Sequence, residues 1–181
     1  MQHKQRFTNV TLVTPYGEVD NDLLIDGDKI VDILDPSENI SDDWKIIDGQ
    51  NNFIFPGMID VLQHGFLNYL YGHAEENCAV ENSKLLPSVG VTGFLPSTPC
   101  LPPEKTKTLL NALSNDIDKA KEGARVLGIH SEGPCFALPG AHDPKNLRKP
   151  SISLAEELLD ACQGKLKALT LAPEMNGSEE F

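Results

Sequence analysis

The fold is decided by the stretch Leu127-Gly128-Ile129-His130-Ser131-Glu132-Gly133-Pro134, in which an apolar run ends in a polar cluster and a Gly-Pro turn. Residues 124–129 have the length and composition of a buried parallel strand. Glu132 comes just past the predicted carboxyl end of this strand. Because α/β barrels build their active sites at the carboxyl ends of their strands, we expect Glu132 to lie in a functional site.

A second segment of the same design begins at Phe55. A short apolar strand, Met58 to Leu62, is followed closely by His64. From there on, strands alternate with helices, which predicts parallel βαβ units. The predicted strands are residues 58–62, 91–95, 124–129 and 166–171, and the predicted helices are residues 75–89, 103–121 and 153–162. These are about four of the eight strands of a TIM-like barrel, whose closed form takes roughly 200 residues or more.

The first 54 residues follow a different pattern. Four short β-rich pieces, at residues 7–14, 23–25, 29–34 and 45–47, are separated by turn signals such as Pro15-Tyr16-Gly17 and Asp48-Gly49. Turn residues at this spacing are typical of antiparallel hairpins. The sequence therefore predicts a small antiparallel β domain over residues 1–54, followed by the α/β domain over residues 55–181.

The composition excludes several classes of partner. The chain has 181 residues and a formal net charge of −12, which argues against nucleic acid and against anionic membranes. No apolar run approaches the roughly 20 residues of a membrane span. The four cysteines form no C-x-x-C pair, which favours reduced thiols in a cytoplasmic protein.

Five motifs in order resemble one family. They are Pro56-Gly57-Met58-Ile59-Asp60, Gly90-Val91-Thr92-Gly93-Phe94-Leu95-Pro96-Ser97-Thr98, Gly128-Ile129-His130-Ser131-Glu132-Gly133-Pro134, Gly140-Ala141-His142-Asp143-Pro144 and Thr170-Leu171-Ala172-Pro173-Glu174. Together they resemble the N-terminal half of the N-acetylglucosamine-6-phosphate deacetylases, which belong to the amidohydrolase superfamily. The resemblance implies a small β domain, a TIM-like barrel and a small-molecule amino-sugar substrate in a homodimeric enzyme.

The resemblance also implies a metal site. Glu132 matches a glutamate that binds one divalent metal ion, for which zinc is expected, and the metal activates the water that attacks the acetamide carbonyl. Many amidohydrolases carry His-x-His on the first strand, but here the two positions are Leu62 and His64. Leu62 cannot bind a metal, which favours a site with a single ion. For His64 two roles stay open, as a metal ligand or as a hydrogen-bonded support.

Two further residues are expected to contact the substrate. His142 matches a histidine of the family that contacts the sugar, and Gly65 opens a stretch where the backbone approaches the substrate. Phe66 and Leu67 are bulkier than the glycines usual there, so we expect them to narrow this approach or to rebuild the pocket. The catalytic aspartate of the family and its later histidine ligands would lie beyond Phe181, so no general base is assigned.

Two alternatives remain open. One is a non-catalytic fragment or interaction-only protein that keeps part of the fold; a chain that stops at Phe181 would expose a strand edge and is expected to aggregate or to need a partner. The other is an amidohydrolase that acts on a different amide. Members that open cyclic amides often use a lysine at the end of the fourth strand, whereas this strand ends in Leu169-Thr170-Leu171.

Overall fold

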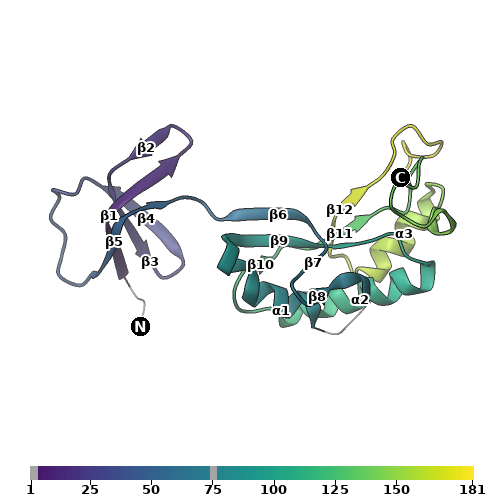
Figure 1. Ribbon diagram of the computed structural model, residues 1–181, viewed down its shortest axis with the longest axis horizontal. Coiled ribbons are helices and arrows are strands. Elements are labelled where there is room, and N and C mark those ends of the chain that lie inside the picture. Colours follow the sequence, from purple (N-terminus) through teal and green to yellow (C-terminus); the bar gives the residue numbers. More distant parts are fainter. Residues whose placement is uncertain (1–3, 74–76) are drawn as a thin grey trace. The chain divides into compact units, whose positions relative to one another are not determined.

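The chain divides into two compact units, Met1–Pro56 and Gly57–Phe181. The computed structural model describes residues 4–73 and 77–181 (Figure 1). The first two residues of the helix expected over residues 75–89 lie outside this described part. Among the described residues, no helix is long and apolar enough to cross a membrane.

Unit Met1–Pro56 is a five-stranded mixed sheet. Its strands are β1 Lys4–Thr14, β2 Gly17–Val19, β3 Asp22–Asp26, β4 Lys29–Leu34 and β5 Lys45–Ile54. β1 pairs with β2 and β3 in antiparallel register, β3 pairs with β4 in the same way, and a small core forms around Val10, Leu12 and Leu23. However, β5 runs parallel to β1. The prediction of an all-antiparallel domain is therefore wrong for β5.

The error has a physical cause. Strands β2 to β4 lie between β1 and β5 in the sequence, so no tight turn sets the direction of this pair. The Asp48-Gly49 signal is not a turn between strands either, since it lies within β5, opposite an irregularity at Asn9. A Cβ at Gly49 would lie 2.1 Å from Cγ1 of Val10. Gly49 is thus required by the close approach of the two strands.

Unit Gly57–Phe181 is built on a parallel sheet. Its strands are β6 Met58–Gln63, β9 Val91–Thr98, β10 Arg125–Val126, β11 Ile129–Glu132 and β12 Leu166–Thr170. β6 pairs with one edge of β9, β10 and β11 pair with successive stretches of β9, and β12 pairs with β11. β10 and β11 together occupy one position in the sheet. The resulting four positions follow the chain order, as in the first half of an α/β barrel.

Helices connect these strands. They are α1 Cys78–Leu85, continued by the 3₁₀ turn Leu86–Val89, then α2 Pro103–Lys119 and α3 Ile152–Ala161. Figure 1 shows α1 and α2 along one face of the sheet, and α3 packs against α2. Leu109, Leu110 and Leu113 of α2 enter the core together with Phe94 of β9. The helical spacing of these leucines is the reason that α2 could be predicted from the sequence.

The strand predicted over residues 124–129 is broken. β10 ends at Val126, and β11 begins at Ile129 and continues to Glu132. The break falls at Gly128, whose φ is +152° and where a Cβ would lie 2.1 Å from Cγ of Lys167. The Leu127 N–H still bonds to Phe94 of β9, whereas the Ile129 N–H bonds to Lys165, just before β12. Glu132 is consequently the last residue of a strand rather than a residue beyond it.

Candidate functional site

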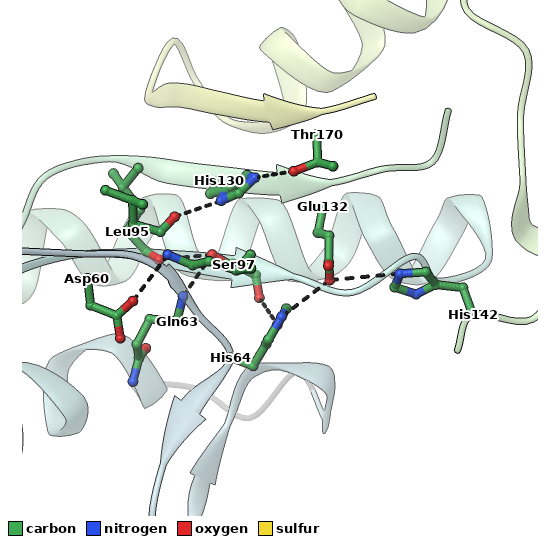
Figure 2. A network of polar contacts seen from close by, with 11 residues as sticks. Asp60, Gln63, His64, Leu95, Ser97, His130, Glu132, His142 and Thr170 are labelled. Atoms are coloured by element: carbon green, nitrogen blue, oxygen red, sulfur yellow. Dashed lines mark hydrogen bonds and ion pairs between the residues drawn. The ribbon is translucent and has the colours of Figure 1, made fainter. Parts of the chain in front are cut away.

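Three polar side chains meet at the carboxyl ends of β6 and β11. His64 directly follows β6, Glu132 ends β11, and His142 comes from the loop after β11. Oε2 of Glu132 lies 3.3 Å from Nε2 of His64 and 3.9 Å from Nε2 of His142. Figure 2 shows both imidazole rings pointing at this carboxylate. The structure thus brings together three of the four residues predicted for the site.

His64 is held with one ring nitrogen toward Glu132. Its Nδ1 lies 3.1 Å from the carbonyl oxygen of Ser97, and because a carbonyl only accepts, Nδ1 carries the hydrogen. In the neutral ring, the lone pair of Nε2 then faces the carboxylate. Two acceptors this close repel one another unless a proton on Nε2 or a metal ion lies between them. Nδ1–H bonded to a carbonyl with Nε2 turned toward an anionic ligand is a usual arrangement of a metal-binding histidine.

The spacing of this pair also suits a metal. Two ligands of a tetrahedral zinc ion, each about 2.0 to 2.2 Å from the metal, lie about 3.4 Å apart. The distance of 3.3 Å between Glu132 and His64 agrees with that value. Within residues 4–73 and 77–181, however, no three His, Cys, Asp or Glu side chains lie close enough to hold a metal ion. Glu132 and His64 therefore fit two positions of a site that needs further ligands.

His142 is fixed by an aromatic neighbour. Its ring stacks on Phe136, with centroids 4.9 Å apart and an angle of 6° between the ring planes. Gly133 makes room for this pair, because its φ is +88° and a Cβ there would lie 2.5 Å from Cε2 of Phe136. Asp143 then caps the 3₁₀ turn Pro144–Asn146. His142 therefore stands in an ordered loop, and Phe136 is a site residue that the motifs did not reveal.

Gly65 begins a small hairpin that was not predicted. The hairpin consists of β7 Gly65–Phe66 and β8 Tyr69–Leu70, followed by the 3₁₀ turn Tyr71–His73. Gly65 has a φ of +118°, and a Cβ would lie 2.3 Å from the carbonyl oxygen of Tyr69. Phe66 packs against the core, and Leu67 is 67% exposed. The hairpin thus explains Gly65 structurally, while its contact with substrate stays a prediction.

Asn82 of α1 holds this hairpin in place. Its Oδ1 accepts a hydrogen bond from the Phe66 N–H at 3.1 Å, and its Nδ2 donates to the carbonyl of Tyr69 at 2.9 Å and to the hydroxyl of Tyr71 at 2.8 Å. Asn82 is completely buried. A buried amide with its donors and its acceptor satisfied rigidifies its surroundings. The backbone that follows His64 is therefore firmly placed.

At the end of β6, hydrogen bonds to side chains replace the regular backbone hydrogen bonds to β9. Its register against β9 shifts between Asp60 and Gln63. Within the shift, Oδ1 of Asp60 accepts from the Leu62 N–H at 3.2 Å, and Oγ of Ser97 accepts from the Gln63 N–H at 3.0 Å. Figure 2 shows these contacts beside His64. Residues from β6 and β9 thus replace the missing backbone bonds immediately before His64.

Three buried cysteine thiols have raised pKa values. Burial raises the pKa of Cys100 and of Cys135 above the ordinary value of a thiol. Burial also raises the pKa of Cys162, to about 12. All three thiols are therefore protonated at neutral pH in the metal-free protein.

Comparisons with known proteins agree on one family. No protein-family model matches the chain. The chain is 33% identical to the N-acetylglucosamine-6-phosphate deacetylase of Danio rerio over 159 residues, a match that covers 81% of the chain and 39% of that enzyme. It is 31% identical to the enzyme of Rattus norvegicus over 188 residues, which covers 97% of the chain and 44% of the enzyme.

Solved structures give the same result. The crystal structure of N-acetylglucosamine-6-phosphate deacetylase from Pasteurella multocida matches with a TM-score of 0.83 and 26% identity, over 97% of the chain and 46% of that structure. A more distant structure, N-acyl-D-glutamate deacylase from Bordetella bronchiseptica complexed with zinc and a phosphonate inhibitor, has a TM-score of 0.55 and 14% identity over 99% of the chain and 40% of that structure. This second likeness shows the fold alone.

The resemblance and the fold class predicted from the sequence are therefore confirmed. The chain matches the N-terminal part of the N-acetylglucosamine-6-phosphate deacetylases, as a small β-rich domain followed by part of a TIM-like barrel. It spans less than half the length of the relatives that it matches, between 39% and 46% in these family members.

Proposed function

We propose that this chain, whose relatives are N-acetylglucosamine-6-phosphate deacetylases, forms part of a metal-dependent hydrolase that removes the acetyl group from N-acetylglucosamine 6-phosphate or a related N-acetylated amino sugar. The observation that carries the proposal is the facing pair of Glu132 and His64 at the carboxyl end of the parallel sheet. This is the edge at which barrels of this class place their chemistry. Similarity along 97% of the chain supports the same reaction class.

Glu132 and His64 would hold one divalent metal ion, for which zinc is the best candidate. A carboxylate and an imidazole are ligands that zinc accepts, and the N···O spacing fits its coordination. When bound, such an ion polarises a carbonyl and lowers the pKa of a bound water. In this chain Glu132 supplies the negative charge, and the Ser97 carbonyl keeps the Nε2 of His64 available to the ion.

His142 and Gly65 are the residues that we assign to the substrate. His142 lies on the far side of Glu132 from His64, and its Nε2 can exchange a hydrogen bond with a polar group placed next to the carboxylate. Stacking on Phe136 fixes the ring for this purpose. Gly65 follows His64 directly and offers backbone without a side chain. We further propose a homodimer, on the strength of the family resemblance, and a cytoplasmic location, because the four cysteines form no C-x-x-C pair.

A second function is compatible with one observation. Within the described residues the candidate site provides two well-placed metal ligands, and no third joins them. A protein that keeps this fold without catalysis, as a binding or interaction module, would look the same. The two proposals differ in whether the protein releases acetate.

An acetate-release assay separates them. The protein that contains this chain, together with the further metal ligands and the general base that the site needs, is incubated with N-acetylglucosamine 6-phosphate, with its galactosamine epimer and with unphosphorylated N-acetylglucosamine, and its metal content is measured in the same samples. We expect acetate from a phosphorylated sugar, loss of activity with a chelator, and no activity in Glu132→Gln. Glu156→Gln, an exposed change on α3, is the matched control. A metal-free protein that releases no acetate would favour the non-catalytic function.

A further inference from the structure

We propose that His130 is a positioning residue that holds His64 opposite Glu132, a role that rests on the metal site proposed above. His130 is 7% exposed, and both of its ring nitrogens have partners. Nδ1 lies 2.7 Å from the carbonyl oxygen of Val61, and Nε2 lies 2.8 Å from Oγ1 of Thr170 (Figure 2). One side chain of β11 therefore reaches β6 in one direction and β12 in the other.

The bond to Val61 joins strands that share no backbone hydrogen bonds. β6 and β11 both pair with β9, which lies between them. Backbone pairing alone would thus fix each of them to β9 but not to one another. His130 bridges them directly, from a position two residues before Glu132 to a carbonyl three residues before His64. The chain segments from His130 to Glu132 and from Val61 to His64 are both short. The hydrogen bond between His130 and Val61 therefore sets the distance between the side chains of Glu132 and His64.

The irregular end of β6 makes the Val61 carbonyl available. The register of β6 against β9 shifts between Asp60 and Gln63, and the Leu62 N–H turns to the Asp60 side chain. A carbonyl that the backbone pairing leaves free can accept from a side chain, and His130 donates to it. Without this bond, the backbone just before His64 would lose one of the contacts that replace the ladder.

The partners of His130 also define its tautomer. The Val61 carbonyl can only accept, so Nδ1 carries the hydrogen. In the neutral ring Nε2 then accepts from the hydroxyl of Thr170. This asymmetry allows the two bonds to be tested separately. The side-chain nitrogen of Asn occupies nearly the place of Nδ1 and keeps the bond to Val61, whereas Gln reaches toward the place of Nε2 and loses it.

Nuclear magnetic resonance of the imidazole rings tests the proposal without metal. The chain has only five histidines, so a ¹⁵N-labelled, chelator-treated sample gives few ring signals. His64→Asn assigns the His64 signals, and Glu132→Gln shows where they lie when the carboxylate is removed. We expect His130→Gln and the apolar variant His130→Leu to move the His64 signals toward the Glu132→Gln positions. His130→Asn should leave them at the wild-type positions. Circular dichroism verifies that each variant is folded.

Zinc affinity gives a second readout. Groups that orient a metal ligand contribute about 10- to 100-fold to affinity, so His130→Gln should bind zinc that much more weakly than His130→Asn. The proposal would be overturned if the His64 signals moved in neither His130→Gln nor His130→Leu. It would also be overturned if His130→Gln and His130→Asn changed the His64 signals and the zinc affinity equally. A protein whose zinc affinity does not depend on Glu132 would instead refute the metal site, and the ring signals would still decide the role of His130.

Discussion

At the scale of single residues, the loop after β11 depends on one glycine. Gly133 has a φ of +88°, which strains any other residue, and an added Cβ would lie 2.5 Å from the Phe136 ring that supports His142. Gly133→Ala should therefore lower the free energy of unfolding by about 1–3 kcal/mol. The measurement is urea denaturation followed by circular dichroism.

Gly140→Ala is the matched control for this prediction. Gly140 also has a positive φ, of +56°, but nothing lies within 4 Å of its added Cβ. Its substitution should cause only the backbone strain, about 1 kcal/mol. If both variants were destabilised equally, the contact between Gly133 and Phe136 would have no energetic weight.

The same scale shows what the sequence could and could not reveal about the site. The positions of Glu132 and His64 at strand ends followed from short apolar runs next to them, and His142 followed from its motif. Phe136 carried no such signal, and the motifs that contain Asp60 and Ser97 did not reveal the contacts of these two residues. Ser97 lies 33 residues from His64 in the sequence, and it holds the His64 ring through its backbone carbonyl, which any residue type supplies.

At the scale of elements, the start of α1 depends on a residue of α2. The residue before α1, Asn77, has a φ of +63° and its side chain does not cap the helix. Asp116 of α2 does so instead, because its carboxylate accepts hydrogen bonds from the N–H groups of Asn77 and Ala79 at 3.2 and 3.1 Å. Asp116 is 2% exposed. The first and second helices of the barrel portion are thereby tied together.

Asp116→Asn should weaken this connection. The amide keeps only one accepting oxygen and turns an NH₂ group toward a backbone N–H, so the free energy of unfolding should fall by about 1–3 kcal/mol. Thermal and urea denaturation measure the loss. Asp118→Asn, two residues further on, removes only an ion pair between Lys165 and an exposed carboxylate and should change stability much less. The reverse order of the two effects would contradict the capping role.

Elements were predictable where their signal was local. α2 and β9 followed from apolar periodicity and from an apolar run; both begin at the expected residue, α2 ends two residues earlier than expected, and β9 continues three residues further. Three features depended on distant partners. The direction of β5, the break at Gly128 and the hairpin after His64 are set by contacts of Gly49 with Val10, of Gly128 with Lys167 and of Asn82 with Phe66. No local pattern contains that information.

At the scale of the whole molecule, the two units should unfold separately. The first unit has a small core around Val10, Leu12 and Leu23, whereas the core of the second involves all three α-helices. The chain has one tryptophan, Trp44, in the first unit, and every helix of the described residues lies in the second. Tryptophan fluorescence and ellipticity at 222 nm therefore report on different units.

We expect the fluorescence transition of Trp44 in urea to have a lower midpoint than the ellipticity transition. Both signals are recorded on the same samples, so concentration and pH are matched. Coincident midpoints would show that the units unfold as one cooperative body.

The central claim is that Glu132 is a metal ligand, and a calorimetric titration of the protein with zinc tests it most directly. Wild-type protein should bind one ion, and Glu132→Gln should bind it roughly 100-fold more weakly or not at all, because loss of a ligand costs at least as much as loss of a group that orients one. Glu156→Gln should bind as the wild type does. Equal zinc affinity of wild-type protein and Glu132→Gln would contradict the account.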